Sequence, residues 1–191
     1  MPSHGTEAFA SSCAIDFVPV VGNGRTAPFR ASSLLRPEPP ERFPGFRRQI
    51  LAPLDGVVVA ARDGLPDHHA HRGMPSLSYA LTQRRRAGGG WGDLAGNHVF
   101  IRQNAVIIAL CHLERGSIAV RLGQHVQLGD AIARCGNSGN STEPHLHVQA
   151  MDDARVEHAR ALPMTFRGEL PHNREILDIA SPRRPASLPF A

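Results

Sequence analysis

Short apolar runs separated by glycine and polar turns occupy the middle of the chain. Val57–Ala61 and His98–Arg102 are typical, because each is bounded by turn residues and contains β-branched side chains. Such runs predict the strands of an all-β fold, an antiparallel β-sandwich or barrel. No amphipathic helices of adequate length alternate with them, which argues against a parallel α/β fold. The predicted strands span 14–18, 50–52, 57–61, 98–102, 105–110, 118–122, 126–128, 131–135 and 145–150, with a hairpin turn at 103–104.

Two long segments interrupt this pattern. Residues 19–48 are rich in proline and arginine, and residues 62–95 contain a histidine cluster and a glycine run. Within the second segment we expect a short helix over 77–87, which the glycine run would end. The length suits a single domain over 1–170 that carries both inserts. Residues 171–191 form a C-terminal extension without a core-forming pattern, and we expect it to be poorly ordered.

The composition excludes several chemistries. All 21 basic residues are arginine, so the chain cannot form a P-loop, a Schiff base or a lysine-linked biotin or lipoate. The net charge of +4 and the aromatic content of 5% argue against nucleic-acid binding, which relies on aromatic platforms interleaved with arginine. No apolar run is long enough to predict a transmembrane helix. The first residues lack the basic and apolar regions of a secretory signal.

The chain contains eleven histidines, and two of them share one predicted strand. His145 and His147 are two positions apart, so they lie on one face at a spacing of about 7 Å. Two such imidazoles can bind one metal, or one can bind it while the other transfers protons. The spacing alone more often reflects two half-exposed strand residues. The three cysteines lack metal-ligand spacing, and we expect them to be small buried apolar residues.

Five ordered motifs resemble those of one peptidase family. They are Ala-Pro-Leu-Asp-Gly-Val-Val at 52–58, Gly-Asn-His-Val at 96–99, Leu-Cys-His-Leu at 110–113, Gly-Gln-His-Val-Gln-Leu-Gly at 123–129, and Gly-Asn-Ser-Gly-Asn-Ser-Thr-Glu-Pro-His-Leu-His at 136–147. Together they resemble the lysostaphin-type (LytM-like) zinc metalloendopeptidases. The resemblance implies an antiparallel β-fold built on a duplicated hybrid motif. It covers residues 50–61 and 96–150 well, and 10–18 more loosely.

The resemblance also implies a set of zinc ligands. In this family a His-x-x-x-Asp strand and the second histidine of His-x-His bind the zinc, which corresponds here to Asp16 and His147. Ser12 stands where the family has the first histidine, and serine is a poor zinc ligand. Because a catalytic zinc needs three protein ligands, we expect His4 to replace it. Cys13 suits this position less well, since its odd offset from Asp16 turns it to the other side of a strand.

The remaining implied roles concern hydrolysis. His112 and His145 would stand beside the hydrolytic water, one accepting its proton and the other stabilising the oxyanion. Leu110 replaces a tyrosine that is usual in the family, which removes a hydroxyl that could contact substrate. The implied activity is cleavage of peptide bonds in peptidoglycan cross-bridges or stem peptides. The implied location is the cell envelope or the exterior, in conflict with the missing export signal.

Two alternatives remain open. Because Ser12 replaces a ligand, the domain could keep the fold and act as a cell-wall binding or regulatory module. A phosphocarrier domain of a sugar-uptake system, which has a related β-fold and paired histidines, is a weaker alternative.

The cluster His68, His69 and His71 could form a second metal site, but its Pro/Gly-bounded surroundings favour a solvated loop. The histidines expected to be partly exposed and structural are His98, His125, His158 and His172.

Overall fold

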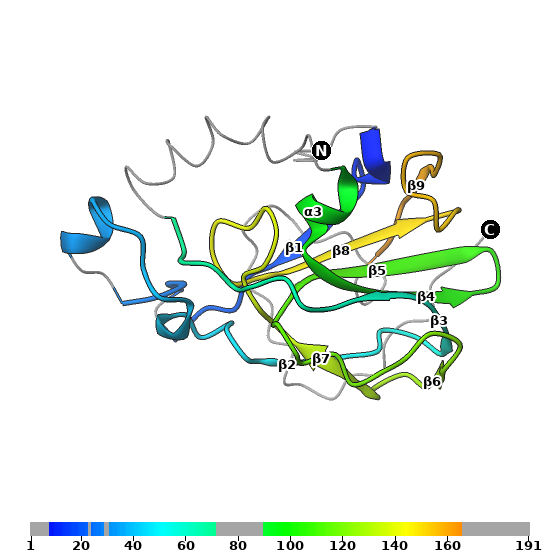
Figure 1. Cartoon of the computed structure of the whole chain (residues 1–191), viewed down its shortest axis with the longest axis horizontal. Coiled ribbons are helices and arrows are strands. Elements are labelled where there is room, and N and C mark those ends of the chain that lie inside the picture. The colour runs from blue at the N-terminus through cyan, green and yellow to red at the C-terminus, as the bar shows by residue number, and fades with distance from the viewer. Residues whose placement is uncertain (1–7, 23, 29–30, 72–89, 166–191) are drawn as a thin grey trace.

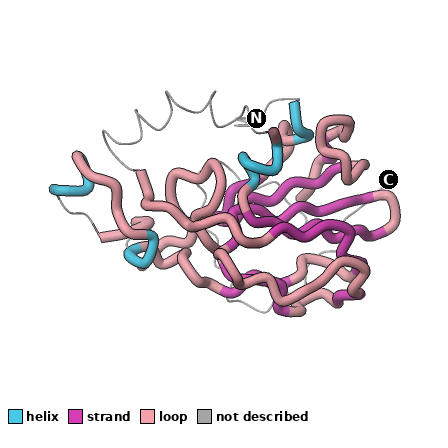
Figure 2. Tube along the Cα trace, viewed as in Figure 1, coloured by secondary structure: helices cyan, strands magenta, loops and turns pink. Residues whose placement is uncertain are grey.

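The computed structural model describes residues 8–22, 24–28, 31–71 and 90–165 (Figure 1). The expected helix at 77–87 and the extension at 171–191 lie outside these residues. Within them the chain is built from strands and loops, with only short helical turns (Figure 2). None of the helices is long and apolar enough to cross a membrane, as far as the described residues go.

An open antiparallel sheet carries most of the strands. Its order is β1-β8-β5-β4-β3-β6, and β9 pairs with β8. A second sheet consists of β2 and β7 alone. The strands are β1 (Ile15–Phe17), β2 (Gln49–Leu51), β3 (Gly56–Arg62), β4 (Asn97–Gln103), β5 (Val106–Leu113), β6 (His125–Val126), β7 (Ala131–Arg134), β8 (Leu146–Met151) and β9 (Ala161–Leu162). The all-β antiparallel prediction is confirmed, and the described strands form no closed barrel.

Both faces of the main sheet are buried. Side chains alternate between two faces along a strand, and on β4 Val99 and Ile101 enter one apolar cluster while Phe100 enters another. The first cluster also contains Ile50 and Ile132 from the small sheet, so it fills the space between the two sheets. All of β5 is buried as a result.

A short helix covers part of the second face. Trp91, the first residue of α3 (Trp91–Ala95), contacts Phe100 edge-on, with ring centroids 5.2 Å apart. Trp91 also lies edge-on to His98 at 4.9 Å. The expectation that His98 is partly exposed is therefore wrong, because the indole covers its ring and leaves it 7% exposed.

Two strand predictions need correction. Residues 118–122 do not form a strand, although the backbone N–H of Ala119 donates to the carbonyl of Ile132. One such bond without a continuous ladder leaves this run extended but not part of a sheet. β9 was not predicted, since two residues are too short to show an alternating pattern.

The first insert contains two short helical turns, η2 (Ala31–Leu34) and η3 (Pro40–Arg42), and β2 follows it. It lies beside the end of the main sheet where β1 ends and β8 begins (Figure 1). An isolated bridge between Glu38 and Ala70 joins it to the second insert. The two inserts therefore contact each other rather than extending separately into solvent.

Candidate metal and hydrolytic site

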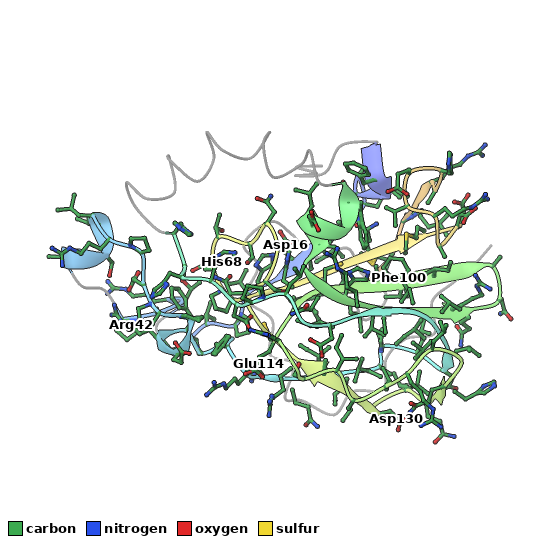
Figure 3. All side chains as sticks on the ribbon, in the orientation of Figure 1. Asp16, Arg42, His68, Phe100, Glu114 and Asp130 are labelled. Carbon is green, nitrogen blue, oxygen red and sulfur yellow. The ribbon has the colours of Figure 1, made fainter. Side chains whose placement is uncertain are left out.

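Asp16 and His147 face each other across two neighbouring strands. They are direct partners in the antiparallel pairing of β1 with β8, which places their side chains on one face. His147 Nδ1 lies 2.8 Å from Asp16 Oδ1, and His145 Nε2 lies 3.7 Å from the same oxygen. Both histidines of the His-x-His motif therefore point toward Asp16. Asp16 lies between Phe100 on the sheet and Arg42 in the first insert in the view of Figure 3.

Asp16 and His147 shift each other's pKa toward the charged form. Burial raises the pKa of Asp16, but the hydrogen bond with His147 and the nearby imidazoles outweigh burial and lower it well below its ordinary value. Burial likewise lowers the pKa of His147, but the hydrogen bond and negative charge of Asp16 raise it above 6.5 overall. Each group therefore favours the charged form of the other, a carboxylate beside an imidazolium, through two atoms that can both bind a metal.

His112 joins the site through an unusual backbone conformation. Its neighbour Cys111 is the direct partner of His147, so regular alternation would turn His112 to the opposite face. Instead His112 has φ of 62°, a left-handed conformation that a non-glycine residue adopts only at an energetic cost. Its ring centroid lies 4.7 Å from that of His145 and 5.8 Å from that of His147. The left-handed residue thus brings a third imidazole to the site.

The turn before β8 orients two of the three rings. His112 Nδ1 lies 2.9 Å from the carbonyl oxygen of Ser138, and His145 Nδ1 lies 2.8 Å from that of Glu143. A carbonyl oxygen only accepts hydrogen bonds, so both Nδ1 atoms carry the proton. The Nε2 atom of each neutral ring then has a free lone pair. Burial and the neighbouring imidazoles lower the pKa of His112 well below 6.5, which keeps this ring neutral at physiological pH.

Close backbone packing fixes the turn itself. Gly139 has φ of 73°, and a Cβ there would collide with the backbone of Gly96 and Leu94. The N–H of Asn140 donates to the carbonyl of Leu94 at the end of α3. Only glycine fits this left-handed and crowded position. The glycine of the signature therefore lets the turn lie against α3 and β4.

Both inserts brace the same turn. In the first insert, Thr26 Oγ1 donates to Glu143 Oε2 at 2.7 Å. In the second, Asp67 Oδ1 accepts the backbone N–H of Asn137 at 2.6 Å, and His68 Nε2 lies 3.0 Å from the carbonyl of Gly139. The expectation of a solvated loop at His68 is wrong, since it is half-buried against the turn. The contacts of these three insert residues with the turn were not predicted, because nothing in the sequence indicates a contact so distant along the chain.

The described residues supply two of the three predicted metal ligands. Asp16 and His147 offer a carboxylate oxygen and an imidazole nitrogen, which suit zinc. Among the residues that the structure describes, no group of three or more His, Cys, Asp and Glu side chains is arranged to hold a metal. His4, the predicted third ligand, lies outside them. Ser12 and Cys13 are both half-buried.

Comparison with known proteins agrees with this geometry. Residues 85–158 match the model of peptidase family M23. This match confirms the resemblance to the lysostaphin-type (LytM-like) peptidases that the motifs predict.

Individual relatives are similar over part of the chain. Peptidoglycan DD-endopeptidase ShyC of Vibrio cholerae is 34% identical over 87 residues, which are 42% of this chain and 20% of that protein. Lysostaphin of Staphylococcus simulans is 27% identical over 88 residues, 46% of this chain and 18% of that protein. The chain thus spans about a fifth of the length of these relatives. The solved catalytic domain of S. simulans lysostaphin aligns with 61% of this chain and 68% of that chain, at 22% identity and a TM-score of 0.41.

Proposed function

We propose that the protein is a zinc-dependent endopeptidase that hydrolyses peptide bonds of peptidoglycan, in cross-bridges or stem peptides. The observation that carries this proposal is the convergence of three histidine rings and one carboxylate where β1 ends and β8 begins. The family match supports it, as do relatives whose names describe peptidoglycan and glycyl-glycine endopeptidases. Such a substrate places the protein in the cell envelope or outside the cell.

Asp16, His147 and His4 would hold the metal. When bound, zinc lowers the pKa of water and polarises a carbonyl group. The chain's own part is to present two donor atoms from paired strands, whose register sets the distance between them. His4 would complete the three ligands that a catalytic zinc requires.

His112 and His145 would handle the protons of hydrolysis. The two backbone carbonyls of the turn leave each Nε2 lone pair available, and a neutral imidazole can accept a proton from water or return it to a leaving amine. The lowered pKa of His112 favours the neutral form that a base requires. Leu110, where the family has tyrosine, is buried in the core between the sheets, so it presents no hydroxyl to a substrate.

Metal content and hydrolysis test this proposal together. The wild-type chain is expected to carry stoichiometric zinc and to release new amino groups from purified peptidoglycan. His147→Ala should lose the zinc, whereas His112→Ala should keep it and lose roughly 10²–10⁴-fold in rate. His158→Ala, at an exposed position, is the matched control and should change neither. A wild-type chain that takes up no zinc and releases no amino groups would refute the proposal.

A second candidate is a cell-wall binding or regulatory module without activity. The observation that favours it is the presence of only two convergent metal donors in the described part of the chain, with Ser12 at the usual third position. His4→Ala separates the two functions. A loss of zinc assigns His4 as the ligand of an enzyme. Unchanged metal content, together with peptidoglycan binding without cleavage, favours the module.

A further inference from the structure

A buried glutamine connects the site to the segment that precedes β1. Gln149 is fully buried on β8, two residues after His147 and therefore on the same face. Its Oε1 lies 3.1 Å from His147 Nε2. Its Nε2 donates to the backbone carbonyl of Phe9 at 3.1 Å and lies 3.6 Å from Met151 Sδ. Every polar atom of this amide is thus occupied.

These contacts show which tautomer of His147 Gln149 favours. The carbonyl of Phe9 can only accept, so the amide group that faces it is the NH₂ of Gln149. The amide oxygen must then face His147, where it accepts from a protonated Nε2. Asp16 Oδ1, 2.8 Å from Nδ1, accepts from the other nitrogen. In the neutral ring the two partners therefore favour opposite tautomers, and Gln149 favours the one that leaves the Nδ1 lone pair free for a metal.

The backbone at Phe9, which accepts the hydrogen bond from Gln149, is strained. Phe9 has φ of 67° and Ala10 has φ of 52°, and consecutive left-handed residues other than glycine carry an energetic cost. Ala10 is buried in the same apolar cluster as Met151. A hydrogen bond from a buried amide to Phe9 helps to offset that cost and docks the segment against β8.

We propose that Gln149 is a positioning residue that favours the metal-binding tautomer of His147 and docks the segment around Phe9 beside the metal site. The inference rests on the proposed zinc site. Residues that hydrogen-bond to a metal-bound histidine orient its ring, and their removal typically lowers metal affinity 10–100-fold. Gln149 touches neither metal nor substrate, so its effect passes through His147.

Two substitutions separate the two contacts. Gln149→Met has similar volume but neither accepts from His147 nor donates to Phe9. Gln149→Glu keeps an acceptor toward His147 and places a second acceptor against the Phe9 carbonyl. Gln127→Met, at an exposed position, is the matched control. Zinc affinity of each full chain is measured by competition with a chelator, and folding is followed by thermal unfolding.

We expect Gln149→Met to bind zinc roughly 10–100-fold more weakly than wild type. Gln149→Glu should bind zinc more tightly than Gln149→Met and unfold at a lower temperature than wild type. In ¹H–¹⁵N NMR spectra of the metal-free chain, recorded above the pKa of the ring, His147 should populate the Nε2-protonated tautomer in wild type. In Gln149→Met the population should shift to the Nδ1-protonated tautomer, because Asp16 is then the only one of these two acceptors that is left. Gln127→Met should match wild type throughout.

The outcomes distinguish this inference from the proposed function. If wild type binds no zinc, the proposed metal site itself is refuted. If wild type binds zinc and folded Gln149→Met binds it equally tightly with an unchanged tautomer, the positioning role is overturned while the metal site stands. Equal zinc loss in the Met and Glu variants with the wild-type tautomer in both would also overturn it, since Gln149 would then act by packing alone.

Discussion

Asn97, the asparagine of the Gly-Asn motif, connects the second insert to β5, the strand that contains His112. Its Oδ1 accepts the backbone N–H of Leu65 at 2.9 Å, and its Nδ2 donates to the carbonyls of Leu65 at 2.8 Å and Leu113 at 3.1 Å. The side chain is completely buried. Asn97→Ala removes three hydrogen bonds at once. At about 1 kcal/mol net for each bond, we expect a loss of roughly 3 kcal/mol of unfolding free energy.

Thermal and urea unfolding of the metal-free chain measure this loss. For a domain of this size, about 3 kcal/mol corresponds to a fall of roughly 6–12 °C in Tm. Asn97→Asp is isosteric but turns an oxygen toward two carbonyl oxygens, so it should destabilise at least as much as Asn97→Ala. The control is Asn104→Gly in the exposed hairpin turn, where φ of 53° suits glycine. Its Tm should change little, because it removes no buried contact.

The result that refutes this reasoning is an Asn97→Ala chain within about 1 kcal/mol of wild type, since one lost hydrogen bond alone would account for that. An Asn97→Asp chain as stable as wild type would also refute it. That outcome would mean that the two donor contacts to Leu65 and Leu113 are not important for the fold.

Two further predictions concern the turn and the charged pair. Gly139→Ala should lower the unfolding free energy by more than the roughly 1 kcal/mol that we expect for Gly123→Ala. Both glycines have positive φ, but only at Gly139 would an added Cβ meet neighbouring backbone. The urea midpoints of the two variants measure the difference. The stability that Asp16 and His147 give each other in the metal-free chain should be fully present between their unfolded pKa values of 3.8 and 6.5. It should be lost as pH rises through the raised pKa of folded His147 and, at the acid end, as pH falls through the lowered pKa of folded Asp16. The difference in unfolding free energy between wild type and Asp16→Asn, followed across pH, measures it, and a difference that grows above neutral pH would contradict it.

Period-two patterns predicted the strands where a complete ladder forms. β4 and β5 are long enough for alternation and a hairpin turn to identify them. Residues 118–122 show the same apolar character, but pairing depends on a partner strand that the local sequence does not specify. Burial of β5 on both faces likewise depends on α3 and the small sheet, which cover opposite faces.

The sequence located the site but not its hydrogen-bond partners. Spacing put His145 and His147 on one face, and the family motif added Asp16; the pairing of β1 with β8 brings them together. The position of His112 depends on a left-handed residue that breaks strand alternation, which no pattern of residue types predicts. Gln149 could have been found, since period two places it on the face of His147.

Two different parts of the fold hold the residues of the site. The β1–β8 ladder positions the two described metal donors, whereas backbone carbonyls of the 136–145 turn orient His112 and His145. Both inserts contact that turn, through Thr26 and Asp67. Under the proposed function, a disturbance of the inserts therefore acts on proton transfer before it acts on metal binding. The inserts thus contact the turn that orients His112 and His145, the two histidines proposed to transfer protons.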